Sequence, residues 1–187
     1  EAQVAALADD IAYNNHDIDD GLRAGLFEVQ DLMDVPLVGP VFADLQTRYP
    51  GLERTRLIFE AVRALIGLMV EDLLAETQRR LATLKPQSVD DIRRADGPVA
   101  AFSEAMRAND KALKAFLFER MYRHYRVNRM TSKARRVVGD MFGLFLAEPS
   151  TLPTEWREQT DGPSTPRTAR VVADYIAGMT DRFALEE

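Results

Sequence analysis

Residues 52–84, LERTRLIFEAVRALIGLMVEDLLAETQRRLATL, contain no proline and follow the turn signal Pro50-Gly51. Their apolar residues recur at steps of three and four, a spacing that places side chains on one face of a helix. The periodic positions are Leu57, Ile58, Ala61, Leu65, Leu68, Met69, Leu73 and Leu81. The stretch therefore predicts one long helix, and it sets the expectation for the rest of the chain.

The same helical period continues on both sides of this stretch. Proline and glycine mark the breaks, and Ser88-Val89-Asp90-Asp91 has the pattern of a capping box at the start of a short helix. No segment shows the alternation that is typical of strands. We predict an all-α fold with 1–187 as a single helical region. The expected helices are residues 2–26, 41–49, 52–84, a short one from 88 to about 96, one from 109 through 127, 131–146 and 165–185.

Composition narrows the class of protein. The chain has 187 residues, 46% of them hydrophobic, and a net charge of −6, which disfavours a general nucleic-acid binder. It has no cysteine, which excludes disulfides, thiolate zinc sites and cysteine nucleophiles and fits a cytoplasmic protein. No apolar run approaches the ~20 residues of a membrane span. The sequence begins at Glu1 within a helical pattern, and we expect it to be a piece of a longer protein.

Residues 8–21, ADDIAYNNHDIDDG, are rich in carboxylates and invite a metal-site interpretation. A calcium loop does not fit, because the ligand register is wrong and the helical period runs through the segment. His16 and Asp17 are adjacent, so on a helix they point ~100° apart. His124 is the only other histidine. Two histidines without cysteine do not supply a closed metal site unless several carboxylates join them.

The spacing within this segment indicates a different arrangement. Asp9, Tyr13 and Asp17 are four residues apart, so they climb one stripe of the predicted helix. A carboxylate, a phenol and a second carboxylate could therefore face one pocket. The alternative is a solvated stripe beside an apolar face, and the spacing alone fits both.

A second stripe lies in the basic segment that follows residue 110. Lys114, Phe118 and Tyr122 are again four apart and are surrounded by arginines and lysines. Such cations suit phosphate groups, which accept a point charge from lysine or a bidentate fork from arginine. The alternative is a solvated helix whose positive charge balances the negative charge of the acidic helix, with ion pairs between the two helices.

Three blocks of the sequence resemble a known family in the same order. They are EAQVAALADDIAYNNHDIDDGLRAGLF at 1–27, FLFERMYRHYRVNRM at 116–130 and VVADYIAGMTDRFALEE at 171–187. Together they resemble the C-terminal half of bacterial deoxyguanosinetriphosphate triphosphohydrolase-like proteins of the HD-domain superfamily. The resemblance spans essentially the whole chain.

The resemblance implies a hydrolase that depends on a divalent metal, Mg, Mn or similar. Such enzymes convert a deoxynucleoside triphosphate and water to the deoxynucleoside and inorganic triphosphate. By block position, Asp9 matches the last metal ligand of the family. The earlier ligands, a His and a His-Asp pair, would lie outside this chain. His16-Asp17 is then not that pair, and the chain alone is expected to be inactive.

The resemblance also implies roles for the remaining stripe residues. Asp17 matches a residue that binds the 3′-hydroxyl, and Tyr13 one that stacks beneath the sugar. Tyr122 matches a residue that crowds the 2′ position, and Lys114 a cation that meets the triphosphate. Phe118 stands where relatives place a polar residue. We expect a homo-oligomer. The sequence does not decide whether a nucleotide or a single-stranded nucleic acid acts as an effector. The alternative function is a free-standing helical interaction or oligomerisation module with a vestigial nucleotide site.

Overall fold

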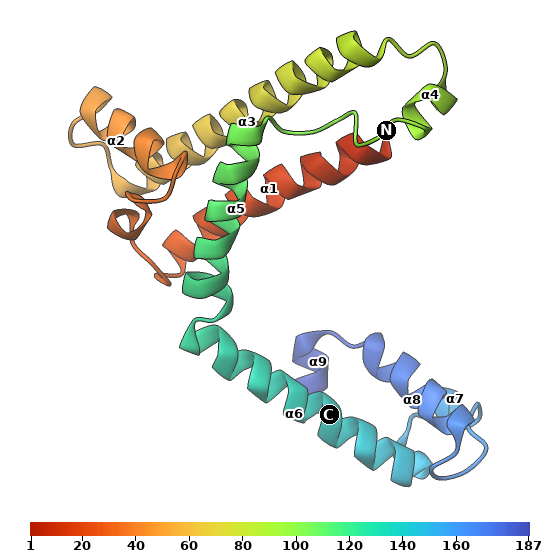
Figure 1. The fold of residues 1–187 in the computed structure, drawn as a ribbon. Coiled ribbons are helices and arrows are strands. Elements are labelled where there is room, and N and C mark those ends of the chain that lie inside the picture. The colour runs from red at the N-terminus through yellow and green to blue at the C-terminus, as the bar shows by residue number, and fades with distance from the viewer. The chain divides into compact units, whose positions relative to one another are not determined.

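The computed structural model describes residues 1–187, and all of its regular structure is helical, which confirms the all-α prediction (Figure 1). The chain divides into two compact units, Glu1–His124 and Tyr125–Glu187, which are described separately below. None of the helices combines the length and the apolar character needed to cross a lipid bilayer.

Two long helices form the centre of the first unit. Helix α1 (Ala2–Arg23) and helix α3 (Arg54–Leu84) lie side by side in opposite directions (Figure 1). Their facing side chains are buried, including Ile18 and Leu65, and each such side chain contributes roughly 1.5–3 kcal/mol when fully removed from water. The core also takes in helix α2 (Val38–Arg48) and the short helix η1 (Val29–Leu32).

The ends of α3 confirm the long helix predicted for residues 52–84. At its start the side chain of Glu53 accepts hydrogen bonds from the backbone amides of Thr55 and Arg56. At its end Lys85 adopts a left-handed backbone with φ of 49°. Not every residue that fits the apolar spacing is buried, since Leu68 fits it and is 41% exposed.

The capping box predicted at Ser88 is also confirmed. Helix α4 (Val89–Arg93) begins with reciprocal bonds between Ser88 and Asp91, each side chain accepting from the other's backbone amide. The bonds satisfy amides that a helix start leaves without an intrahelical partner.

The helix that carries the basic stripe starts earlier than predicted. Helix α5 (Glu104–Leu117) begins five residues before Asn109 because Ser103 caps it, accepting from the amide of Met106. The carboxylate of Asp72 on α3 accepts hydrogen bonds from the backbone amide of Ser103 at 2.9 Å and from the Ser103 hydroxyl at 2.6 Å. The cap thereby fixes the start of α5 against α3.

The end of α5 widens into a π turn, η2 (Phe118–Tyr122). The amide of Arg123 bonds to the carbonyl of Phe118 five residues earlier, at 3.0 Å. Single π turns within α-helices change the direction of the side chains that follow and are frequent at functional sites. The apolar period carries no signal for this turn and predicts a regular helix through residue 127 instead.

The second unit is built on helix α6 (Tyr125–Ala147), which packs against helix α8 (Pro166–Ala177) (Figure 1). Its small core centres on Tyr175, whose ring lies 5.6 Å from Phe145 and 5.2 Å from Trp156 between centroids. The turns η3 (Pro149–Thr151) and α7 (Thr154–Arg157) connect the two long helices.

Two helix boundaries in this unit differ from prediction. Helix α6 begins at Tyr125 and not near Thr131. The predicted helix 165–185 is two helices, because α8 ends at Ala177 and Thr180 starts α9 (Asp181–Glu186) by accepting from the amide of Phe183.

Two glycines are expected to respond to alanine in opposite directions. A Cβ on Gly39, in the first turn of α2, would lie 1.9 Å from the carbonyl oxygen of Met33, so backbone must move and Gly39→Ala should cost about 2–3 kcal/mol. Gly67 lies inside α3 with nothing within 4 Å of such a Cβ, so Gly67→Ala should stabilise by about 0.5–1 kcal/mol. Urea unfolding followed by circular dichroism measures both. A neutral Gly39→Ala would contradict the close approach of α2 to Met33.

Candidate functional site

The predicted acidic stripe lies on α1 at the edge of its buried face. Ile11 and Ile18 anchor that face in the core, and the stripe beside them runs from solvent into the protein. Asp9 and Tyr13 are exposed, Tyr13 by 60%, whereas Asp17 is only 8% exposed. The carboxylate of Asp17 therefore needs a partner from another element.

Tyr122 is that partner. Its hydroxyl, at the end of η2, donates a hydrogen bond to the carboxylate of Asp17 from 105 residues away. Burial and the bond to Asp17 raise the pKa of the Tyr122 phenol, and Tyr13 contributes to the same rise. The two phenols are thus neighbours around Asp17. The structure brings together three of the five predicted site residues at this point.

Lys114 joins α5 to the acidic helix. Its ammonium lies 3.2 Å from the carboxylate of Asp10 on α1 and 3.1 Å from that of Asp110, one turn earlier on α5. Burial acts to lower the pKa of Lys114, but the hydrogen bonds that its ammonium donates to Asp110 and Asp10 outweigh it, so the pKa is raised. An ion pair between the acidic and basic helices, one of the two alternatives left by the sequence, is thus present.

Sequence reasoning missed Asn14, Asp110 and Asp10. The amide of Asn14, which is buried, donates to the carboxylate of Asp110 at 2.7 Å. The sequence spacing places each pair on one helix face, because Asp10 and Asn14 are four residues apart on α1 and Asp110 and Lys114 are four apart on α5. The spacing within one helix does not predict that the two pairs contact each other across the helices.

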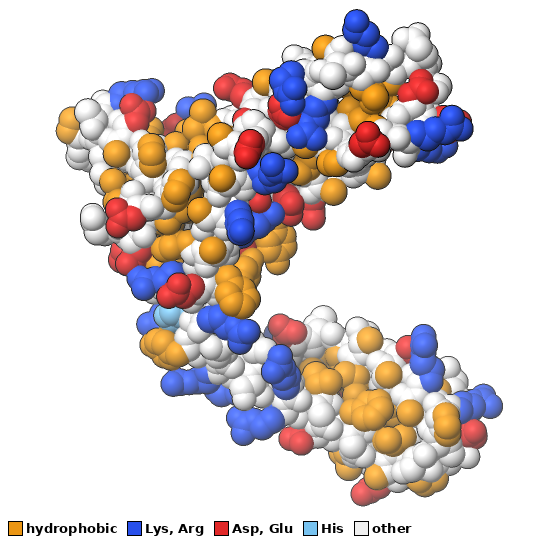
Figure 2. All heavy atoms as spheres, viewed as in Figure 1, with side chains coloured by type: hydrophobic (Ala, Val, Ile, Leu, Met, Phe, Trp, Pro, Cys, Tyr) orange, Lys and Arg blue, Asp and Glu red, His pale blue; other side chains and the backbone are white.

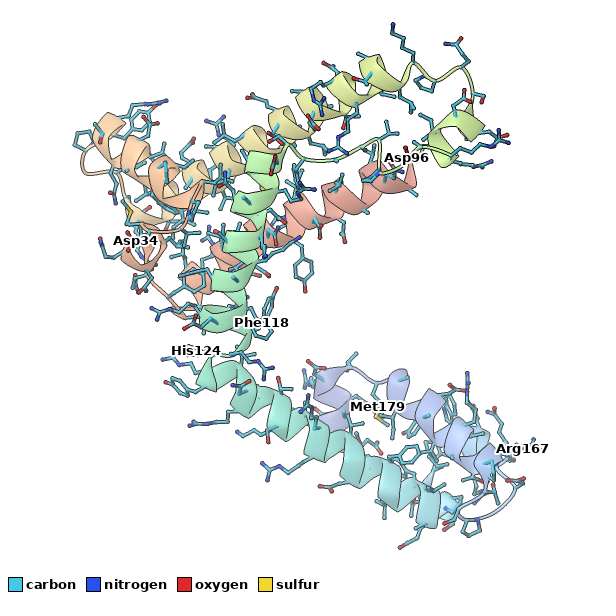
Figure 3. The ribbon with its side chains drawn as sticks, in the orientation of Figure 1. Asp34, Asp96, Phe118, His124, Arg167 and Met179 are labelled. Carbon is cyan, nitrogen blue, oxygen red and sulfur yellow. The ribbon has the colours of Figure 1, made fainter.

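Phe118, the middle residue of the predicted basic stripe, does not join these contacts. Its side chain is exposed at the junction of α5 and η2 (Figure 3), and the guanidinium carbon of Arg123 lies 5.1 Å from the ring centroid. Further lysines and arginines follow one another along the N-terminal half of α6 in the second unit (Figure 2).

The acidic residues of the chain do not form a metal centre by themselves. No group of three or more His, Asp or Glu side chains is placed to hold a metal ion. Asp9 is exposed and engages no other side chain, so its carboxylate is free to bind a cation. One carboxylate completes a metal site but does not make one, and a bound metal would need further ligands from outside these residues.

Comparison with known proteins places the chain among its relatives. Residues 100–187 match the model of the phosphohydrolase-associated domain. Deoxyguanosinetriphosphate triphosphohydrolase-like proteins align with the whole chain, at 63% identity in Parvibaculum lavamentivorans, 56% in Caulobacter vibrioides and 52% in Azorhizobium caulinodans. The aligned residues are 47%, 48% and 46% of these proteins, so the chain spans about half the length of the curated relatives it matches. Over its whole length the chain is therefore similar to deoxyguanosinetriphosphate triphosphohydrolase-like proteins.

Proposed function

We propose that the protein containing this chain hydrolyses deoxynucleoside triphosphates to the deoxynucleoside and inorganic triphosphate. The names of the relatives support a triphosphohydrolase. The observation that carries the proposal is a cluster of side chains from α1, α5 and η2. Asp17, Tyr122 and Tyr13 lie together, and Lys114 of α5 pairs with Asp10 of α1. A hydrogen-bonding carboxylate, two phenol rings and a cation suit a sugar that carries phosphates.

In this proposal each residue has a separate task. Asp17 accepts a hydrogen bond from the 3′-hydroxyl, and Tyr13, which is exposed, offers its ring to the sugar. Tyr122 occupies the space that a 2′-hydroxyl would need. The ammonium of Lys114 binds a phosphate oxygen as a point charge.

The proposed cofactor is a divalent cation such as Mg²⁺ or Mn²⁺, for which Asp9 supplies one ligand. When bound, such a cation activates water and neutralises developing charge at phosphorus. The contribution of this chain is limited to the Asp9 carboxylate, since no ligand set within the 187 residues is complete. The remaining ligands are proposed to come from the part of the protein outside this chain.

The test compares two proteins. The full-length protein and the 187-residue chain are each incubated with the four deoxynucleoside triphosphates and Mn²⁺, and released triphosphate is measured. We expect the full-length protein to turn over and the chain alone to remain inactive, because it lacks the other metal ligands. Turnover by the chain at the full-length rate would contradict the ligand assignment. Absence of triphosphate release from the full-length protein would contradict the proposed reaction.

A second candidate is a helical interaction or oligomerisation module with an inactive nucleotide site. It is supported by apolar side chains that α3 leaves in solvent, such as Phe59 and Leu74, and by a cavity of about 550 Å³ between α2 and α3. In either case we propose a cytoplasmic homo-oligomer. Size-exclusion chromatography of the full-length protein with light scattering tests the oligomer, and the turnover assay separates the two candidates.

A further inference from the structure

The two carboxylates on Lys114 are held very differently. The side chain of Asp110 is 13% exposed and accepts from Asn14 at 2.7 Å as well as from Lys114 at 3.1 Å. The side chain of Asp10 is 51% exposed and binds Lys114 at 3.2 Å. Asp110 is therefore fixed on two sides, whereas Asp10 is tied only through the ammonium.

We infer that Asp110, oriented by Asn14, is a positioning residue that aims the ammonium of Lys114 at the triphosphate, and that Asp10 is the counter-ion which a phosphate oxygen replaces. The inference rests on the proposed function, since it takes Lys114 as the phosphate contact. It assigns opposite effects on phosphate binding to two carboxylates that touch the same cation.

The chemistry of the ammonium explains the difference. Lysine has three donors on a flexible stem, so one firmly held carboxylate removes rotamer freedom that phosphate binding would otherwise have to remove. A second carboxylate competes with the phosphate for the remaining donors and repels its charge. The bond that Lys114 donates to Asp110 thus prepares the site, and the bond that it donates to Asp10 must be broken before the phosphate binds.

Space for that exchange is present next to the pair. Asp10 borders a cavity of about 380 Å³ that Arg80 and Arg107 also line. Its exposed carboxylate can turn into this cavity, toward other cations, when a phosphate takes its place. Asp110 borders the same cavity, but the buried amide of Asn14 holds it in position.

The experiment measures the dissociation constant of inorganic triphosphate for the full-length protein by isothermal titration calorimetry. Asp110→Asn should weaken binding about tenfold, and Asp10→Asn should strengthen it about threefold. Asp44→Asn, which breaks an exposed pair with Arg48 on α2, is the matched control and should leave the constant unchanged. Two carboxylate variants that shift the constant in the same direction would overturn the inference.

A double-mutant cycle separates positioning from a general structural effect. In the Lys114→Ala background, Asp110→Asn should no longer change triphosphate affinity, because the group it acts through is gone. A tenfold loss that persists without Lys114 would show that Asp110 acts through the fold and would overturn the inference. Thermal unfolding of each variant shows whether it is folded at the temperature of the titration.

The same cycle distinguishes this inference from the proposed function. If Lys114→Ala leaves triphosphate affinity unchanged, Lys114 is not the phosphate contact and the assignment under the proposed function fails. If Lys114→Ala weakens binding but Asp110→Asn does not, the phosphate contact stands and only the positioning role is wrong.

Discussion

Replacing Asp9 with alanine in the full-length protein is expected to remove nearly all turnover together with most of the metal affinity. Even partners that only orient a metal ligand cost roughly 10–100-fold when they are replaced, so loss of a ligand itself should cost at least about a hundredfold. Asp9 is exposed and engages no other side chain, so the fold does not depend on it. Mn²⁺ affinity by calorimetry and triphosphate release at saturating Mn²⁺ measure the two effects.

His16 provides the matched control for Asp9. It lies on the same helix and is exposed. Because Asp17 follows it directly, the pair has the appearance of a histidine–aspartate metal site. We expect His16→Ala to keep Mn²⁺ affinity within about twofold, because His16 is not one of the proposed metal ligands. Unchanged Mn²⁺ affinity in Asp9→Ala, or a large loss of Mn²⁺ affinity in His16→Ala, would show that Asp9 is not the metal ligand of residues 8–21.

Replacing Tyr122 with alanine is expected to relax the preference for deoxynucleotides over ribonucleotides. Removing the ring opens the space for a 2′-hydroxyl, and pocket contacts of this size are worth about 10–100-fold in specificity. The measurement is the ratio of kcat/KM for dGTP and GTP. Hydrolysis of dGTP should persist, because Tyr122 supplies neither a metal ligand nor a phosphate contact in the proposal.

Tyr122→Phe separates the ring from its hydroxyl. The phenylalanine keeps the ring, so the dGTP to GTP ratio should stay near that of the unchanged protein. It removes the donor to Asp17, a residue that is only 8% exposed, so KM and stability can change while the ratio does not. A ratio that falls equally in both variants would assign discrimination to the Tyr122–Asp17 bond instead of to the ring.

Local patterns in the sequence predicted much of the fold. The apolar period of residues 52–84 gave α3 to within two residues, because most of its periodic positions face the core. The capping box at Ser88 was readable because its donors and acceptors lie within four residues. Asp9, Tyr13 and Asp17 share a face of α1 for the same local reason.

Other features depend on contacts that no local pattern contains. The π turn at Phe118–Tyr122 interrupts a continuous apolar period, and the start of α5 depends on Asp72 of α3 holding Ser103. The pairing of Asn14 with Asp110 joins residues 96 apart. Spacing placed Asp10 and Asn14 on one face of α1 and Asp110 and Lys114 on one face of α5, but the alignment of the two faces is decided by how α1 and α5 pack.

The hydrogen bond between Tyr122 and Asp17 also constrains when the site can form in the cell. The two residues are 105 positions apart, and the helices η1, α2, α3, α4 and α5 lie between them in the chain. A ribosome that adds roughly 5–20 residues per second needs about 5–20 seconds to synthesise that interval. Throughout this time the nascent chain carries Asp17 without its tyrosine donor, so this hydrogen bond forms late, after the long helices α1 and α3 have been made.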